Sequence, residues 1–180
     1  TPLAEQLWVS VNLSGVQLKH PRLVEEIGDA LHDYALEPRC LLLELTESMA
    51  MENPAAAQTL LMQIRALGVR VSVDDFGTGH SALAYLRQLP LDSLKVDRSF
   101  VRGIEANQDM ASILGAVSTM TRQLGLQMVA EGIEKGEQLE LIRSLDCEFG
   151  QGFLFSKPVD RDRASSMVTA GLPSSPALTA

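Results

Sequence analysis

Apolar residues along the chain follow two alternating spacings, one typical of short buried strands and the other of amphipathic helices. Short runs rich in Val, Leu and Ile are bounded by polar residues and turn residues, which predicts β-strands. Six such strands are predicted, at residues 8–13, 41–45, 69–73, 94–96, 126–130 and around 153–155.

Helical spacing fills the segments between these strands. The clearest helix is predicted at residues 108–124, where apolar residues recur every three or four positions and Gly125 follows as a C-cap. A second helix begins with Asn53 as its N-cap and Pro54 at its first position, and it ends at Gly68. Further helices are predicted at residues 21–34, 81–88, 136–144 and 161–169.

A chain in which strands and helices alternate builds right-handed βαβ units and a parallel sheet. Six units suit an open, doubly wound sheet, whereas a complete TIM-type (β/α)8 barrel needs eight units and typically about 250 residues. The position of the polar residues separates the two architectures. An open sheet concentrates them at one switch point, and a barrel carries them at the carboxyl end of nearly every strand.

Polar residues follow nearly every predicted strand of this chain. A single one of them is explained by a helix cap, but a series over six successive strands favours the rim of a barrel. We therefore predict an α/β fold of the TIM-type (β/α)8 barrel class, here an incomplete barrel of about six βα units. The strand-end residues are Asn12, Glu44, Glu47, Asp74, Asp75, Lys95, Asp97, Glu131, Glu134 and Gln151.

The charge balance restricts the ligands of this rim. The chain has 23 acidic and 15 basic residues and a net charge of −8, which argues against a surface for a nucleic-acid polymer. A small phosphate ligand remains compatible if cations lie between it and the carboxylates. Because the rim offers oxygen ligands and no His or Cys cluster, the expected metal is Mg²⁺ or Mn²⁺.

The adjacent Asp74 and Asp75 suit a site for two metal ions. One carboxylate can bridge two cations about 3.5–4 Å apart, an arrangement that activates water and stabilises the leaving oxygen of a phosphodiester. Lys95 can hold the attacking water or neutralise charge on the phosphoryl oxygens, and a salt bridge to a neighbouring carboxylate is compatible with either role.

Cysteine usage and hydropathy suggest the cellular setting. Cys40 and Cys147 have no CxxC spacing, so we expect two free thiols. No apolar run approaches the roughly 18 residues that a membrane-spanning helix needs. We expect a cytoplasmic domain without direct membrane insertion, whose attachment to the inner membrane, if any, comes from parts outside this chain.

The strand-end motifs occur together in an order that resembles one known family. They read SVNLS, LLLELTES, VSVDDFGTGHSALAYLRQLPLDSLKVDRSFV, QMVAEGIE and CEFGQGFLFSKP, and they span residues 8–158. This combination resembles the EAL-domain family of bacterial phosphodiesterases and receptors for cyclic di-GMP. The resemblance implies hydrolysis of cyclic di-GMP to the linear dinucleotide in second-messenger signalling, with two Mg²⁺ or Mn²⁺ ions in the site.

The resemblance also implies a role for each strand-end residue. Lys95, Glu131 and Asp74 are the implied catalytic residues, with Lys95 orienting the hydrolytic water. Glu47 is the implied anchor of the loop after the Asp pair, and Asp97, Glu134 and Gln151 are implied to bind substrate or hold loops. The implied metal ligands are Asn12, Glu44 and Asp74 for one ion, and Asp74, Asp75 and Glu131 for the other.

Two departures from the family pattern bear on this interpretation. His80 and Ala82 replace a tyrosine and a serine in the loop after the Asp pair, and the Glu-Ala-Leu motif is absent. We therefore expect residues 1–170 to be the C-terminal three-quarters of an EAL-type barrel domain, with a disordered tail at 171–180. An incomplete barrel favours association as a homodimer or a longer chain with flanking sensory or cyclase domains.

Two further hypotheses compete with the enzyme. A non-catalytic receptor would bind cyclic di-GMP and act through a protein partner, and a structural remnant would do neither. Since degenerate members lose metal carboxylates and every visible one is intact here, the enzyme is favoured.

Overall fold

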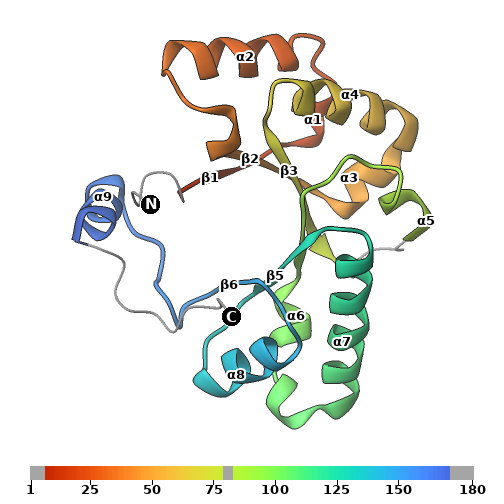
Figure 1. Cartoon of the computed structure of the whole chain (residues 1–180), viewed down its shortest axis with the longest axis vertical. Helices are drawn as coiled ribbons and strands as arrows, with labels where there is room; N and C mark the ends of the chain where they lie inside the picture. Colours follow the sequence, from red (N-terminus) through yellow and green to blue (C-terminus); the bar gives the residue numbers. More distant parts are fainter. Residues whose placement is uncertain (1–6, 79–82, 171–180) are drawn as a thin grey trace. The chain divides into compact units, whose positions relative to one another are not determined.

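The computed structural model describes residues 7–78 and 83–170 (Figure 1). The described strands are β1 Val9–Asn12, β2 Leu41–Thr46, β3 Arg70–Phe76, β4 Ser93–Val96, β5 Gln127–Glu131 and β6 Phe149–Gln151. The α-helices are α1 Gly15–Leu18, α2 Leu23–Asp33, α3 Glu47–Glu52, α4 Pro54–Ala66, α5 Leu83–Leu86, α6 Arg98–Val101, α7 Gln108–Gln123, α8 Gly136–Ser144 and α9 Arg161–Ala170. Two 3₁₀ turns, η2 Pro38–Cys40 and η3 Ile104–Ala106, complete the elements.

The chain divides into two compact units. The first holds residues 1–95 and 124–126, and the second holds 96–123 and 127–180. Both are built from strands followed by helices, which confirms the predicted α/β class. Within residues 7–78 and 83–170, no helix combines the length and apolar character needed to cross a bilayer.

The first unit is a parallel sheet in chain order. Val9 pairs with Leu41 and Leu42 pairs with Arg70, so that β1, β2 and β3 run side by side in one direction. The start of β4 lies beside β3, where the Asp92 N–H donates to the Val71 carbonyl at 2.8 Å. Right-handed crossovers of this kind carry all the carboxyl ends to one edge, which is the condition for a shared site.

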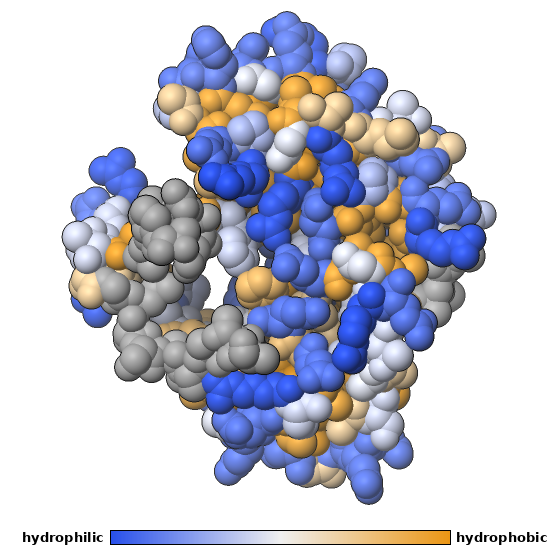
Figure 2. Space-filling model, in the orientation of Figure 1, coloured by the Kyte–Doolittle hydropathy of each residue, from blue (hydrophilic) through white to orange (hydrophobic). Residues whose placement is uncertain are grey.

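Aromatic residues make up only 4% of the chain, and the core of the first unit is mainly aliphatic. Leu61 and Ile64 of α4 are fully buried against the sheet, together with Val71 and Val73 of β3. Helix α2 buries only its Leu23, Ile27 and Leu31 stripe. Its outward side chains are hydrophilic, and they form the blue crest at the top of Figure 2.

The second unit pairs β5 and β6 in parallel, with Val129 opposite Phe149. Met128 of β5 and Leu139 and Ile142 of α8 are buried at 2% exposure or less. Helix α7 contacts β5, with Leu114 fully buried. The apolar residues of its predicted stripe are not buried as a set, because Ile113 is 47% exposed and the other buried residues of α7 are Ser118 and Thr121.

Both units fix the start of a strand in the same way. In the first unit, Asp92 precedes β4 and its Oδ2 accepts from the Val71 N–H of β3 at 2.8 Å. In the second unit, Glu148 precedes β6 and its Oε2 accepts from the Met128 N–H of β5 at 2.9 Å. A carboxylate therefore satisfies a backbone donor near the amino end of the neighbouring strand in each unit, where a buried unpaired N–H would be costly.

The predicted last strand was wrong in position. The strand occupies Phe149–Gln151, and residues 153–155 form a turn in which the Phe155 N–H donates to the Gly152 carbonyl at 3.1 Å. The apolar Phe153 and Leu154 resemble a strand, but they are 57% and 37% exposed. Gly152 allows this turn, because a Cβ there would lie 2.1 Å from the Ile133 carbonyl oxygen.

The other predicted elements agree with the structure to within a few residues. Helix α8 has the predicted bounds, α7 ends one residue earlier than predicted, and α4 ends two residues earlier. Short helices α1, α3 and α6, of four to six residues, were not predicted. Residues 79–82, which include His80 and Ala82, and the predicted tail at 171–180 lie outside the described part of the chain.

Replacing Leu61 by Ala tests the aliphatic core. Leu61 has no exposed surface, so truncation should lower the free energy of unfolding by about 2–5 kcal/mol. Met62, the next residue on α4, is 59% exposed, and Met62→Ala should change the stability by only about 0.5 kcal/mol. Urea unfolding followed by circular dichroism measures both, and equal losses would contradict this packing of α4.

Candidate functional site

The first unit brings several predicted site residues to one edge of its sheet. Asn12 ends β1 and pairs in register with Glu44 of β2. Thr46 of β2 pairs in the same way with Asp74 of β3. Parallel strands in register therefore bring these side chains to the carboxyl edge of three neighbouring strands, where the alternating spacing of the polar residues predicted them.

A buried ammonium group joins this edge. Lys95 of β4 is 5% exposed, and its Nζ lies 2.9 Å from Glu44 Oε2 and 3.1 Å from Asp74 Oδ2. Glu44 is also 5% exposed, so this contact is a buried ion pair rather than a surface one. Burying these charges costs solvation free energy, which the short contacts to two carboxylates offset.

Asp74 and Asp75 have an unusual backbone for two acidic residues in sequence. Asp75 has a φ of 55°, in the left-handed region that a residue with a side chain rarely adopts. Its N–H donates to Asp74 Oδ1 at 2.9 Å, which stabilises the turn and orients the Asp74 carboxylate. Backbone strain of this kind concentrates at functional sites.

Glu47 is positioned to hold the segment after the Asp pair. It is the first residue of α3, follows the Thr46 N-cap, and is 3% exposed. The Gly77 N–H donates to Glu47 Oε2 at 3.0 Å. Its Oε1 is buried, with no hydrogen-bond partner among the described residues. Glu47 thus contacts the backbone of the segment after the Asp pair, and its anchoring role stays a prediction.

The second unit gathers the remaining predicted residues. Glu131 ends β5 directly opposite Gln151 of β6. Asp97 and Glu134 line one polar pocket of about 570 Å³, together with Arg98 and Arg102.

Asp97 has a structural task in this pocket as the N-cap of α6. Its Oδ1 accepts from the Ser99 N–H at 2.9 Å. Burial alone would raise the pKa of Asp97, but hydrogen bonds from the Ser99 side chain and backbone bring it below the usual value. Asp97 is therefore held as a carboxylate at neutral pH.

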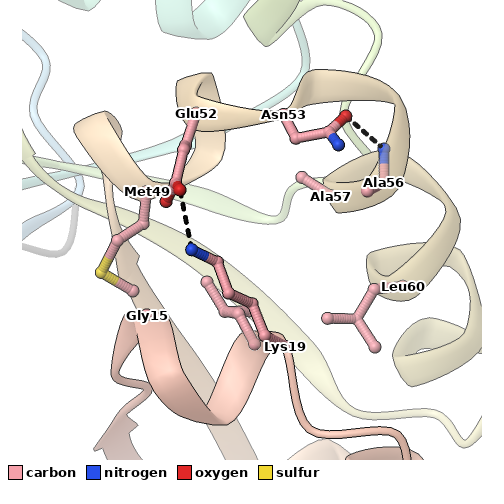
Figure 3. A pocket seen from close by; sticks show the side chains of 9 residues that line it. Gly15, Lys19, Met49, Glu52, Asn53, Ala56, Ala57 and Leu60 are labelled. Atoms are coloured by element: carbon pink, nitrogen blue, oxygen red, sulfur yellow. Dashed lines mark hydrogen bonds and ion pairs between the residues drawn. The ribbon is translucent and has the colours of Figure 1, made fainter.

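Another pocket, of about 260 Å³, lies between α1, α3 and α4 in the first unit (Figure 3). Met49, Ala57 and Leu60 give it an apolar lining, and the Lys19–Glu52 ion pair at 2.7 Å crosses beside it. It contains none of the predicted site residues, and its chemistry differs from that of the charged edge.

The two cysteines are unpaired. Burial raises the pKa of the Cys147 thiol to about 12, so this residue stays protonated and unreactive at neutral pH. The sequence prediction missed a different residue, Gln138 of α8, which is 4% exposed and contacts the loop that carries Glu134. The available signal was its position as the N3 residue of a helix, where Gln accepts from the N-cap backbone.

Comparison with known proteins identifies relatives over almost the whole chain. The sequence model described as the EAL domain matches residues 2–158. The cyclic di-GMP phosphodiesterase NbdA of Pseudomonas aeruginosa is 47% identical over 155 residues, which are 86% of this chain and 20% of NbdA. The bifunctional diguanylate cyclase/cyclic di-GMP phosphodiesterase MucR of the same organism is 42% identical over 160 residues, 89% of this chain and 23% of MucR. The chain thus spans about a fifth of the length of these relatives.

Solved structures agree with the fold. The phosphodiesterase of MucR in complex with c-di-GMP has a TM-score of 0.83 and 42% identity, covering 87% of this chain and 64% of that one. The EAL domain of Mycobacterium smegmatis DcpA has a TM-score of 0.89 and 34% identity, and the match covers 94% of this chain and 76% of that one. A manganese/c-di-GMP complex of Klebsiella pneumoniae BlrP1 has a TM-score of 0.79 and 33% identity, and the match covers 87% of this chain and 41% of that one.

Replacing Glu47 by Ala should release the loop after the Asp pair. The Gly77 N–H loses its carboxylate acceptor, so its exchange with solvent deuterium should become about tenfold faster or more. Glu52→Ala on the same helix is the matched control, because Glu52 is exposed and contacts Lys19 instead. NMR measures the exchange rate of the Gly77 amide in both variants. Unchanged exchange at Gly77 in Glu47→Ala would refute the anchoring role.

Proposed function

This chain belongs to the EAL domain family, and on that basis we propose that it hydrolyses cyclic di-GMP to the linear dinucleotide as a metal-dependent phosphodiesterase. The observation that carries the proposal is the buried cluster of Glu44, Asp74 and Lys95, followed by Asp75 in a strained conformation. NbdA and MucR, which carry this activity in their names, support the choice of substrate.

The donor groups of the first unit fit a hard divalent cation. Two carboxylates of the cluster face a single ammonium, so the three groups together carry net negative charge. Carboxylate and amide oxygens are the ligands that Mg²⁺ and Mn²⁺ prefer, and Asn12 lies in register beside Glu44. A divalent metal also agrees with the manganese and calcium complexes of BlrP1.

We assign the ligands from the family pattern. One cation would take Asn12, Glu44 and Asp74, and the other would take Asp74, Asp75 and Glu131. Mg²⁺ or Mn²⁺ bound in this way supplies an activated water and stabilises charge on the phosphoryl and leaving oxygens.

The protein side chains have separate tasks in this reaction. Lys95 Nζ is a hydrogen-bond donor, so it can hold the oxygen of the attacking water and stabilise negative charge on the phosphoryl group. Asp74 and Glu131 are the proposed carboxylates beside the reacting oxygens. Glu47 keeps the Gly77 segment in place, and Glu134, Asp97 and Gln151 are proposed to position the substrate or the loops.

A non-catalytic receptor for cyclic di-GMP, acting through a protein partner, is the alternative. It would bind the nucleotide with the same groups and release no linear product. The ligand carboxylates Glu44, Asp74, Asp75 and Glu131 are all present in this chain, which favours the enzyme over the receptor.

We further propose the setting of the domain. Residues 1–170 belong to one EAL-type barrel domain, a homodimer is the expected assembly, and flanking sensory or cyclase domains are expected partners. Two relatives carry names that fit such flanking domains, the bifunctional MucR and the oxygen sensor protein DosP of Escherichia coli.

Replacing Asp74 by Asn should lower the rate of cyclic di-GMP hydrolysis by about a thousandfold or more. Asp74 is both the proposed shared metal ligand and a partner of Lys95, and the substitution removes its charge from both contacts. Asp33→Asn, at the exposed end of α2, should keep the parent rate. Chromatography of the linear product, with Mn²⁺ or Mg²⁺ present, measures both.

Chelation and binding measurements complete this test. Activity should disappear with a chelator and return when Mn²⁺ or Mg²⁺ is added. Equal turnover by Asp74→Asn would refute the metal assignment, and calorimetric binding of cyclic di-GMP without any product would support the receptor instead.

A further inference from the structure

The loop at residues 132–135 joins β5 to α8 and carries Glu134 three residues after Glu131. Its path is tightly constrained at the start. Gly132 has a φ of +73°, and a Cβ at this position would lie 2.5 Å from the Cβ of Arg98. Ile133 is fully buried, and its N–H donates to the Gln151 carbonyl at 3.1 Å. The first half of the loop is therefore fixed against α6 and the end of β6.

The second half of the loop depends on one side chain. Gln138 Oε1 accepts from two consecutive backbone donors, the Glu134 N–H at 2.8 Å and the Lys135 N–H at 3.1 Å. Its Nε2 donates to the Val101 carbonyl at 3.3 Å, at the last residue of α6. Gln138 is 4% exposed, so water does not readily replace these contacts.

These contacts require a neutral amide. An N3 residue that only caps a helix can be Glu or Gln, because it needs only an acceptor. Gln138 uses its acceptor and its donor at the same time, and a carboxylate would bury a charge and lose the donor to Val101.

The partners of Gln138 connect two segments that carry predicted site residues. Val101 closes α6, whose N-cap is Asp97, and Glu134 lies in the loop after β5. Asp97, Glu134 and Gln138 line the same polar pocket. We infer that Gln138 is a positioning residue, which holds the loop that carries Glu134 against α6 and thereby sets the placement of Glu131 and Glu134 for catalysis.

A neighbouring contact limits the motion of the same loop from outside. Lys135 forms an ion pair with Glu105 of η3, which raises the pKa of Lys135 and lowers that of Glu105. This pair is exposed on the lysine side and is screened by salt, whereas the Gln138 contacts are buried. Gln138 is therefore the stronger of the two restraints.

The catalytic consequence of this inference rests on the proposed function, whereas the restraint on the loop does not. Gln138→Met keeps the length of the side chain and removes both hydrogen-bonding groups. Gln138→Glu keeps an acceptor for the two backbone donors. Glu137→Met changes the exposed neighbour on α8 and serves as the matched control.

Amide hydrogen exchange measures the restraint directly. In Gln138→Met, the Glu134 and Lys135 amides should exchange about tenfold faster or more, while Ile142 in the last turn of α8 keeps its protection. Gln138→Glu should restore part of that protection, and Glu137→Met should match the parent protein. Unchanged exchange at both amides in Gln138→Met would overturn the inference.

Steady-state kinetics on cyclic di-GMP with Mn²⁺ measure the catalytic consequence. Misplacement of Glu131 and Glu134 should lower kcat of Gln138→Met about tenfold to a hundredfold, with KM changed by less than about threefold. The kcat of Gln138→Glu should lie between that of Gln138→Met and that of the parent protein. A parent kcat retained after loss of amide protection would overturn the positioning role. A parent protein without any turnover would refute the proposed function, and the exchange result would still decide whether Gln138 restrains the loop.

Discussion

The buried ammonium of Lys95 is the constraint on which the charged edge of the first unit depends. Glu44 and Asp74 come from two different strands and would repel each other in a poorly solvated position, and Lys95 lies within 3.1 Å of both. Removing one partner of a buried ion pair typically costs about 3–5 kcal/mol, because the remaining charge stays buried. The same contact therefore fixes the spacing of β2, β3 and β4 at their carboxyl ends and holds two carboxylates side by side where a cation would use them.

This arrangement is not the most stable one that these strands allow. An apolar set of similar volume would avoid the cost of burying charge, and Asp75 would be less strained as glycine at a φ of 55°. The strain at Asp75 opposes folding, and the two carboxylates of Glu44 and Asp74 outnumber the single ammonium of Lys95, which concentrates negative charge at one place. A divalent cation would lower that cost, because a ligand that binds only the folded state adds to its stability. The energetics of the apo edge thus agree with its proposed role as a metal site.

The sequence predicted the elements whose signal is local and repeated. Aliphatic runs marked β1 to β5, and the apolar stripe of α7 marked its length, because burial on one face imposes a period on the sequence. The last strand was misplaced because Phe153 and Leu154 look like a strand, whereas the close approach of Gly152 to Ile133 forces a turn. Helices of about one turn, such as α6, have too few residues for a period. The strand-end residues were predictable by position, whereas Gln138 follows no strand, and its contacts with Val101 and Glu134 appear only in the folded chain.

Polar side chains accept from backbone N–H groups at both the amino ends and the carboxyl ends of the strands. At the amino ends, Asp92 and Glu148 each accept from a backbone donor of the preceding strand. At the carboxyl ends, Glu47 and Gln138 accept from the backbone of the segments that follow β3 and β5. Backbone donors are fixed in number and must be satisfied wherever they are buried. Glu47 and Gln138 take up that task for the segments that follow β3 and β5, so the carboxylates proposed as metal ligands do not have to satisfy the Gly77, Glu134 and Lys135 N–H groups.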